Sequence, residues 1–439
     1  MKKMNVCVVG TGYVGLVTGT CLAESGHRVV CVDSDIRKIN MLEKGKIPIY
    51  EPGLDKLVLK NKKAGRLFFT RRIAEGIMHD GHHADVAFIA VGTPPRSDGS
   101  ADLSFVEKVA EEIAQAITQY TVIVEKSTVP VETGEWIAKT AARFVRKNVE
   151  FDVASNPEFL REGSAVTDFL KPDRIVIGTS SERAAKVMND VYAPLKSPIL
   201  FTDTKSSELI KHASNSFLAA KISFINAVSA LCERTGANIE DVSRGMGMDK
   251  RIGASFLKAG IGFGGFCFPK DLEAFYWIAR KKGYDFDLLR NVKEINEDQK
   301  MWTVHKAEEE LWNLGGKTVA VLGLAFKPDT DDMRFAPSID IIKSLHERHA
   351  IIRACDPIAQ ENAKELLKGY DVTFCKNVYD TVKDADCIML LTEWDEFKNM
   401  DLKKVLKLMR HPIMLDGRNV FSPEQMRKLG FIYKSVGRP

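Results

Sequence analysis

A ten-residue segment at positions 262–271 concentrates residues that could perform covalent chemistry. It reads GFGGFCFPKD and combines three glycines with Cys267, Lys270 and Asp271. Glycines allow backbone amides to approach a substrate closely. The nearby ammonium group and a helix beginning after Pro269 would favour the thiolate form of Cys267, which could attack an aldehyde. The alternative interpretation is a structural cysteine buried at the start of a helix.

Two other groupings carry residue types suited to proton transfer and to stabilising negative charge. The segment NPEFLREG at residues 156–163 follows a strand-like run and supplies two carboxylates. Lys211 and Asn215 lie four positions apart in a helical pattern, and therefore on one face of that helix. Taken singly, each of these polar residues could be a helix cap or a surface charge. Their occurrence together with Cys267 favours an active site.

The motif GTGYVG at residues 10–15 is typical of a dinucleotide-binding turn. It follows the apolar run 6–9 and precedes a helical pattern, and a second apolar run ends in Asp33. In such a turn the glycines permit a tight bend, a close approach to a pyrophosphate, and close packing of helix on strand. Asp33 stands where an acid accepts ribose hydroxyls and repels the extra phosphate of NADP, which favours NAD. Arg37 and Lys38 weaken that discrimination because both carry positive charge.

Two later turns would line the nicotinamide side of the same domain. VGTP at residues 91–94 and EKSTVP at residues 125–130 each end a strand-like run. Ligands of open parallel sheets bind beyond the carboxyl ends of the strands, where these turns lie. Without that context, either turn could be ordinary loop chemistry.

The elements around these motifs alternate between short apolar runs and helical periodicity, which predicts parallel sheets covered by helices. One long amphipathic helix is expected at 203–236, with Asp203 as its N-cap and Gly236 as its C-cap. We therefore predict an α/β protein with two doubly wound Rossmann-like domains joined by a central long-helix region, with domains at 1–203, 204–314 and 315–439. The expected strands are at 6–9, 29–33, 86–91, 122–125, 174–178, 199–202, 318–322, 351–355, 387–391, 413–416 and 431–436, and further helices at 103–117, 133–145, 241–246, 271–282 and 289–313.

The composition of the 439-residue chain excludes several classes of protein. Hydrophobic residues make up 45% and charged residues 28%, which is an ordinary globular balance. The net charge of +4 gives no support for binding of nucleic acid. No secretory signal pattern and no uninterrupted apolar segment long enough to span a bilayer are evident, so we expect a cytoplasmic protein without a membrane partner. The eight cysteines show no metal-binding spacing, so we expect no metal and seven small buried thiols.

Taken together, the motifs resemble those of the UDP-glucose/GDP-mannose dehydrogenase family. GTGYVG, VGTP, STVP, NPEFLREG, the Lys211/Asn215 pair and GFGGFCFPKD occur in the family's order, and GLAFKPDTDDMR and DGRN follow near the C-terminus. The match covers nearly the whole chain. The resemblance implies that a primary alcohol of a nucleotide sugar is oxidised to a carboxylate in two hydride transfers, each to a separate NAD, without release of the aldehyde.

On this chain, the resemblance makes Cys267 the nucleophile that forms a thiohemiacetal and then a thioester. Lys211 and Asn215 would stabilise the oxyanion during these steps. The full catalytic set that the resemblance implies is Cys267, Lys211, Asn215, Asp271, Glu158 and Thr128.

Proton transfer would involve the remaining members of this set. Asp271, with Thr128 and a water, would belong to the proton-transfer network, and Glu158 would help to activate water for thioester hydrolysis. The division of labour among Glu158, Lys211 and Asp271 stays open.

The resemblance also implies the ligand contacts and the assembly. Guanidinium and ammonium groups suit a diphosphate ligand, and Arg251 could come from the neighbouring subunit of a homodimer formed through the central helix. The implied cofactor contacts are Gly10, Gly12, Tyr13, Val14, Gly15, Asp33, Lys38, Gly92, Thr93, Pro94, Ser127, Thr128, Glu162, Lys270 and Arg334. The implied sugar-nucleotide contacts are Glu158, Phe159, Leu160, Arg161, Lys211, Asn215, Arg251, Phe256, Leu257, Gly260, Gly264, Lys327 and Arg418.

Two positions depart from the family's usual pattern. Phe266 precedes Cys267 where members often carry serine or tyrosine, and residues 335–338 read Phe-Ala-Pro-Ser where many carry Glu-Ser-Pro-Ser. The first departure could alter sugar selectivity, and the second could reshape a cofactor contact.

The favoured reaction is the oxidation of UDP-glucose to UDP-glucuronate. The nearest alternative is a sister enzyme acting on GDP-mannose or on a UDP-N-acetylhexosamine, which the FLREG and GFGGFC segments favour less. A one-step hydroxy-acid dehydrogenase of the same fold would not need Cys267. A non-catalytic NAD-sensing or scaffolding protein would not need the catalytic set at all.

Overall fold

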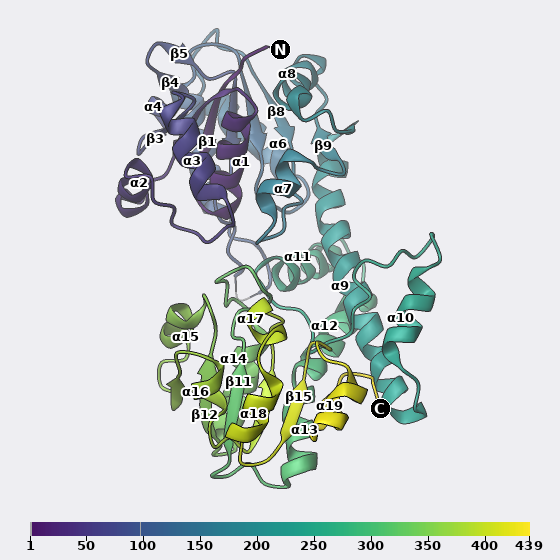
Figure 1. Cartoon of the computed structure of the whole chain (residues 1–439). Helices are drawn as coiled ribbons and strands as arrows, with labels where there is room; N and C mark the ends of the chain where they lie inside the picture. The colour runs from purple at the N-terminus through teal and green to yellow at the C-terminus, as the bar shows by residue number, and fades with distance from the viewer. Residues whose placement is uncertain (1, 97) are drawn as a thin grey trace. The chain divides into compact units, whose positions relative to one another are not determined.

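The computed structural model of the chain describes residues 2–96 and 98–439 (Figure 1). These residues form two compact units. The first unit comprises Met1–Ser214 and Trp277–Gly283, and the second comprises Asn215–Tyr276 and Tyr284–Pro439. The division falls within two helices, α9 (Thr204–Thr235) and α11 (Cys267–Lys281).

The first unit contains an eight-stranded sheet with the strand order β10-β9-β8-β7-β6-β1-β2-β3. Its strands pair in parallel, except that β8 and β9 are antiparallel. The run β3-β2-β1-β6-β7-β8 has the order of a dinucleotide-binding fold, in which the ligand lies beyond the carboxyl ends of the strands. The strands are β1 (Asn5–Val9), β2 (Arg28–Val32), β3 (Leu67–Thr70), β6 (Val86–Ile89), β7 (Thr121–Glu125), β8 (Phe151–Ser155), β9 (Ile175–Gly178) and β10 (Ile199–Thr202), and a separate hairpin pairs β4 (Met78–His79) with β5 (His82–His83).

Helices cover both faces of this sheet, because its central strands are apolar on both sides. Along β1, Val6 and Val8 belong to the buried cluster that includes α1, whereas Cys7 and Val9 belong to the cluster that includes α5. The turn that follows β1 is therefore anchored between two packed layers. The helices of this unit, besides the first part of α9, are α1 (Tyr13–Glu24), α2 (Ile36–Glu43), α3 (Leu54–Lys63), α4 (Ile73–Ile77), α5 (Ser104–Ala116), α6 (Thr133–Phe144), α7 (Ala165–Leu170), α8 (Glu182–Tyr192) and the 3-10 helix η1 (Ala193–Leu195).

The second unit contains a six-stranded parallel sheet with the order β13-β12-β11-β14-β15-β16. This order is again that of a doubly wound fold. The strands are β11 (Thr318–Leu322), β12 (Ile351–Cys355), β13 (Val372–Phe374), β14 (Cys387–Leu390), β15 (Ile413–Asp416) and β16 (Ile432–Ser435). The helices, besides parts of α9 and α11, are α10 (Ile239–Gly247), α12 (Asp287–Lys300), α13 (Trp302–Leu311), α14 (Pro337–Glu347), α15 (Gln360–Leu366), α16 (Val378–Val382), α17 (Asp395–Lys398), α18 (Leu402–Leu408) and α19 (Pro423–Leu429).

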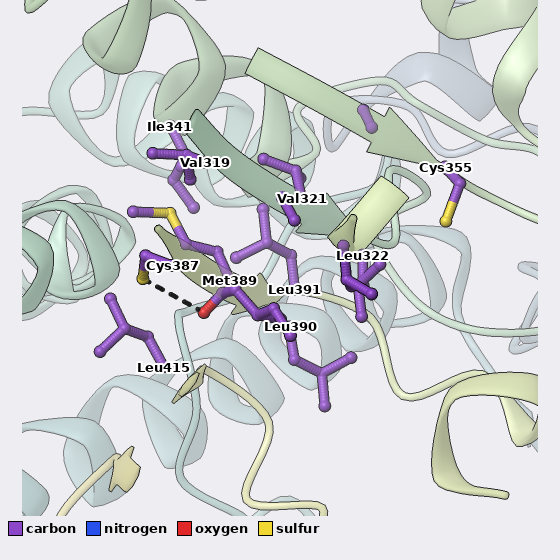
Figure 2. Packing of buried hydrophobic residues seen from close by; sticks show 14 of the residues in the cluster. Val319, Val321, Leu322, Ile341, Cys355, Cys387, Met389, Leu390, Leu391 and Leu415 are labelled. Carbon is purple, nitrogen blue, oxygen red and sulfur yellow. Dashed lines mark hydrogen bonds between the residues drawn. The ribbon is translucent and has the colours of Figure 1, made fainter. Parts of the chain in front are cut away.

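The core of the second unit lies around β11 and β14. Val319 and Val321 of β11 pack in one buried cluster with Met389 of β14 and Ile341 of α14 (Figure 2). Two cysteines of this cluster are visible in the same view as buried thiols. Across the described chain, seven of the eight cysteines are buried and Cys267 is partly exposed, as predicted.

The structure confirms the α/β class with two doubly wound sheets and a long central helix. Asp203 caps α9 by accepting the N–H of Ser206 over 2.9 Å, and Gly236 ends the helix in the left-handed conformation at φ +79°. Three expectations were inexact: β3 was not predicted as a strand, residues 289–313 form two helices rather than one, and α11 begins at Cys267 instead of after Pro269. The three domain boundaries stay a prediction.

Length and composition alone would let α9 cross a membrane, because its most apolar 18-residue window has a mean hydropathy of 1.3. No other helix in the described residues meets both criteria. The segment is not an uninterrupted apolar run, because charged residues such as Glu208, Lys211 and Lys221 occur within it. Two of its polar side chains are nevertheless bonded within the protein: Ser223 donates to Val292 O over 2.7 Å, and Asn226 Oδ1 accepts Gly260 N–H over 2.9 Å. We therefore interpret α9 as a packed helix of this fold.

Candidate active site

The glycine-rich turn after β1 has the geometry that a pyrophosphate requires. Gly10 has φ +103°, and a Cβ on Gly15 would lie 1.9 Å from Gly10 O, so neither position admits a side chain. A Cβ on Gly12 would meet no atom of the described residues within 4 Å. Gly12 thus faces open space at the N-terminus of α1, where free N–H groups can meet phosphate charge. The turn fits a dinucleotide.

Asp33 directly follows β2 and reaches back to this turn. Its Oδ2 accepts the N–H and the hydroxyl of Thr11 over 2.9 and 2.7 Å, and its Oδ1 accepts Asp35 N–H over 2.9 Å. Burial raises the pKa of the Asp33 carboxyl, but these hydrogen bonds and Lys38, with its Nζ 3.7 Å away, outweigh it and hold the pKa below its usual range. The carboxylate is therefore ionised, as an acceptor for ribose hydroxyls must be. Lys38 neutralises part of its charge, as the sequence suggested.

The VGTP and STVP turns lie side by side at the carboxyl ends of β6 and β7. Thr93 Oγ1 donates to Thr128 O over 2.9 Å, and Ser127 Oγ donates to Val91 O over 2.7 Å. Each turn is therefore fixed by a hydroxyl of the other. The structure places both at the edge of the sheet where a nicotinamide would lie.

Tyr13 connects the glycine-rich turn to the NPEFLREG segment through a residue that the sequence did not single out. Its hydroxyl is hydrogen-bonded to the buried carboxylate of Glu51, and Gly163 N–H donates to both the hydroxyl and Glu51 Oε2, over 3.0 and 2.7 Å. Burial and the Glu51 carboxylate raise the pKa of Tyr13 well above its usual value. Glu162 lies next to this junction.

Glu158 and Lys211 form a buried ion pair in the first unit. Lys211 Nζ lies 3.0 Å from Glu158 Oε1, and Leu160 N–H donates to Glu158 Oε2 over 2.5 Å. Lys211 Nζ also lies 5.4 Å from the ring centre of Phe159, whose other contact is the Arg174 guanidinium at 4.0 Å. The structure thus joins two separately predicted residues, a carboxylate and an ammonium, in a buried, hydrogen-bonded setting, where electrostatic stabilisation is strong.

A second buried lysine, Lys126, belongs to the same region. Its Nζ donates to Asn156 Oδ1 over 3.0 Å and to Tyr192 Oη over 3.4 Å. Burial lowers the pKa of Lys126 to about 8, an effect that nearby Lys211 reinforces and Glu158 opposes. Lys126 could not be predicted from the sequence, because it is marked by its burial, which depends on positions far apart along the chain. The EKSTVP motif that contains it was the only available indication.

Two further buried carboxylates lie along α9 and β7. Glu208 accepts the N–H groups of Glu132 and Gly134, over 2.6 and 2.7 Å, and so caps the start of α6. Burial raises the pKa of Glu208 to about 7 although these N–H donors act in the opposite direction. Burial and the charge of Glu208 raise the pKa of Glu125 well above its ordinary value.

This arrangement predicts a pH-dependent stability. Because the folded protein holds the Glu208 proton more tightly than the unfolded chain, this group favours folding below its ordinary pKa of 4.5, and the benefit is lost as the pH rises through about 7. In Glu208→Gln, the free energy of unfolding relative to the unsubstituted protein should therefore increase by about 2.5 kcal/mol between pH 5 and pH 8. Urea unfolding at the two pH values measures this difference. Glu135→Gln, at a half-exposed position of α6, is the matched control, and an equal shift there would contradict the assignment.

In the second unit, Cys267 is the first residue of α11 and lies one helical turn before Asp271. Asp271 is 1% exposed; its Oδ2 accepts Asn215 Nδ2–H over 2.6 Å, and its Oδ1 lies 2.7 Å from Lys270 Nζ. The structure therefore brings together the predicted amide, ammonium and carboxylate beside the predicted nucleophile. Lys270, predicted as a cofactor contact, is engaged with Asp271.

The glycines before Cys267 have a structural reason that the sequence did not reveal. A Cβ on Gly264 would lie 2.3 Å from Phe335 O, and a Cβ on Gly265 would lie 2.7 Å from the ring of Phe326. The close approach is thus to the protein's own loops. A substrate contact of Gly264 stays a prediction.

Arg418 follows β15 and holds the same loops together. Its guanidinium donates to Leu391 O over 2.8 Å and to Gly262 O and Phe326 O, each over 3.1 Å. Burial lowers the pKa of Arg418, with Glu393 opposing that effect. The side chain predicted to face phosphates therefore fixes three carbonyl oxygens.

The remaining predicted residues of the second unit are more dispersed. Arg334 stacks 4.3 Å from the ring centre of Phe266 and is paired with Asp332, and Lys327 Nζ lies 5.3 Å from the ring centre of Phe326. Arg251 is exposed and pairs with Asp249. Leu257 is buried, Gly260 is bonded to α9 and Phe256 has φ +66°.

Profiles of one family match three parts of the chain. The NAD binding domain of the UDP-glucose/GDP-mannose dehydrogenase family matches residues 4–196, its central domain residues 205–298 and its UDP binding domain residues 320–423. The chain belongs to this family. Its cofactor is therefore NAD, which agrees with the geometry of the glycine-rich turn and Asp33.

Individual relatives of this dehydrogenase cover its whole length. The UDP-glucose 6-dehydrogenase TuaD of Bacillus subtilis is 48% identical over 100% of this chain and 94% of its own. The solved structure of a UDP-glucose dehydrogenase from Pyrobaculum islandicum has a TM-score of 0.93 at 39% identity and covers 100% of this chain and 98% of its own. A UDP-D-ManNAc dehydrogenase from Pyrococcus horikoshii has a TM-score of 0.87 at 28% identity, over 99% of each chain.

The same dehydrogenase shows no cluster of three or more histidine, cysteine or acidic side chains that could hold a metal, within residues 2–96 and 98–439.

Proposed function

We propose that this protein is a UDP-glucose 6-dehydrogenase. It oxidises UDP-glucose, with two NAD and one water, to UDP-glucuronate, two NADH and three protons. The observation that carries the proposal is Cys267 at the first position of α11, one turn before an Asp271 that Asn215 and Lys270 hold in place. Relatives named for this activity are 48% identical over the full length. A one-step dehydrogenase of the same fold has no use for such a thiol.

The chemistry assigned to the thiol accounts for the second oxidation. NAD, when bound, accepts the hydride from carbon 6 of the sugar in each of the two steps. Cys267 Sγ forms a bond to carbon 6 of the aldehyde and gives a thiohemiacetal. Loss of hydride and of the hydroxyl proton from this adduct leaves a thioester. Attack by water breaks the carbon–sulfur bond, releases the carboxylate and regenerates the thiol.

The polar residues stabilise charge and transfer protons during these steps. Lys211 and Asn215 stabilise the negative charge on the sugar oxygen in both steps. Glu158 accepts hydrogen bonds from Lys211 Nζ and from Leu160 N–H, which suits a base that activates the hydrolytic water. Asp271, with Thr128 and a water, carries the proton of the primary alcohol.

A panel of sugar nucleotides tests the substrate assignment. The value of kcat/KM for UDP-glucose should exceed that for GDP-mannose and for UDP-N-acetylhexosamines by at least about 100-fold, because a site built to hydrogen-bond particular hydroxyls rejects analogues strongly. The 28% identity to a UDP-D-ManNAc dehydrogenase, against 48% to TuaD, supports this order. A higher kcat/KM for either alternative would reassign the substrate.

The proposed assembly is a homodimer formed through α9. Phe217, Phe224 and Leu231 recur every seven residues along this helix and are 67%, 54% and 57% exposed. Three large apolar side chains on one stripe suit a second copy of the same helix. The proposed location is the cytoplasm, which agrees with eight free cysteines in the described chain.

Sedimentation measures this assembly directly. The double variant Phe217→Asp/Phe224→Asp should sediment as a monomer at micromolar concentration, because it places charges in the apolar stripe. Trp136→Asp changes an equally exposed aromatic residue on α6 and should leave the dimer intact. A dimeric double variant would exclude α9 as the interface.

A further inference from the structure

The turn that follows β11 in the second unit repeats the turn that follows β1 in the first. Gly323 has φ +95° and donates its N–H to Cys355 O over 2.9 Å. Gly10 has φ +103° and donates its N–H to Val32 O over 2.7 Å. The acceptor in each case is the last residue of the neighbouring strand, β12 or β2. In both units, the turn thus has a glycine with the same backbone conformation and the same hydrogen bond.

An aspartate follows that neighbouring strand in both units. Asp33 Oδ2 accepts the N–H of Thr11, the residue after Gly10. Asp356 Oδ2 accepts the N–H of Leu324, over 2.7 Å, and of Ala325, over 3.1 Å. Asp356 is therefore the positional counterpart of the acid that accepts ribose hydroxyls in the NAD-binding turn.

The Asp356 carboxylate instead accepts its hydrogen bonds from within the protein. Asp356 is 7% exposed, its Oδ1 accepts the N–H groups of Ile358 and Ala359 over 2.9 and 2.7 Å, and its Oδ2 also accepts Trp394 Nε1–H over 3.1 Å. Five N–H donors thus converge on one buried carboxylate. A buried charge is stable only when it is hydrogen-bonded in this way.

The carbonyl groups of the same turn are bonded as well. Ser338 Oγ donates to Leu324 O over 2.5 Å, and Thr392 Oγ1 donates to Ala325 O over 2.6 Å. In the first unit, by contrast, Gly12 faces open space. The second turn therefore offers neither free amides nor room to a pyrophosphate, and it is rigid.

The rigid turn leads directly to the loop of the nucleophile. Phe326 follows Ala325, and its ring lies where a Cβ on Gly265 would be 2.7 Å away. Gly265 precedes Cys267 by two residues, and Lys327 follows Phe326. A displacement of the turn would move the surface on which the Cys267 loop rests.

We propose that Asp356 is a positioning residue, which fixes the 324–327 turn and through it the Cys267 loop and Lys327. The same bonds prevent this turn from accepting a dinucleotide, and they fix Lys327, which the family resemblance assigns to the uridine diphosphate sugar. The inference rests on the proposed function only for the identity of that ligand.

A pair of matched substitutions tests the inference in the full-length protein. Asp356→Asn keeps the size of the side chain but leaves buried N–H groups without an acceptor, and should raise the Kd for UDP about 10-fold while the Kd for NAD changes less than about two-fold. Asp33→Asn should give the opposite pattern. The rate at which iodoacetamide alkylates Cys267 should change at least about three-fold in Asp356→Asn only, because its loop loses its support.

Neither the Kd values nor the alkylation rate requires turnover. Both measurements therefore test the inference even if UDP-glucose proves not to be the substrate. A folded Asp356→Asn protein with an unchanged Kd for UDP and an unchanged alkylation rate would overturn the inference. An equal loss of NAD binding would overturn it too. If Asp356→Asn does not fold, Trp394→Phe removes one donor only and should shift the same two readouts in the same direction; unchanged values there contradict the proposal.

Discussion

Cys267→Ser should lower the steady-state rate of NADH formation by about 1,000-fold or more, because a neutral hydroxyl does not replace a thiolate as the nucleophile. The first hydride transfer does not involve the thiol. In a rapid-mixing experiment with UDP-glucose, NAD and a hydrazine that traps aldehydes, the variant should therefore still form up to one NADH per site. Absorbance at the NADH band gives both the rate and the amplitude.

A second cysteine controls for general effects of the substitution. Cys375→Ala changes a buried thiol elsewhere in the second unit and should keep the rate within a few-fold of the original. Retention of the original rate in Cys267→Ser would show that the oxidation does not pass through a thioester.

Lys211→Met should destabilise the protein and inactivate it for two separable reasons. The substitution leaves Glu158, 6% exposed, without its cationic partner, and removal of one member of a buried ion pair costs about 3–5 kcal/mol of unfolding free energy. It also removes the ammonium group that stabilises the oxyanion, which should lower kcat by about 100- to 1,000-fold.

The double variant separates these effects. Lys211→Met/Glu158→Gln removes both charges of the ion pair, and most of the lost stability should return in urea unfolding. The activity should stay low, since both proposed functional groups are absent. If the double variant recovers activity together with stability, the Lys211–Glu158 ion pair has a structural role only.

The cofactor half of the site could be read from the sequence because its determinants are local. A strand, GTGYVG, a helix and Asp33 lie within one short stretch, and the structure joins them as expected through Thr11. Long-range burial was not readable. Lys126 meets Asn156 and Tyr192 across 30 and 66 positions, and no local pattern marks such a lysine as buried.

The glycines of the predicted catalytic loop have a role that its composition did not indicate. Its glycines suggested a close approach to substrate, whereas Gly264 and Gly265 are required by the Phe335 carbonyl and the Phe326 ring. Arg418 suggested a phosphate contact but donates to carbonyl oxygens of three loops. Composition predicts which residue types gather, and packing decides what each of them touches.

The ratio of NADH formed to sugar consumed tests the account most directly. Purified protein with excess NAD and a limiting amount of UDP-glucose should yield two NADH per sugar, and the product should carry a carboxylate at carbon 6. A ratio of one NADH per sugar, with an aldehyde or ketone released, would contradict the thioester route and the role of Cys267.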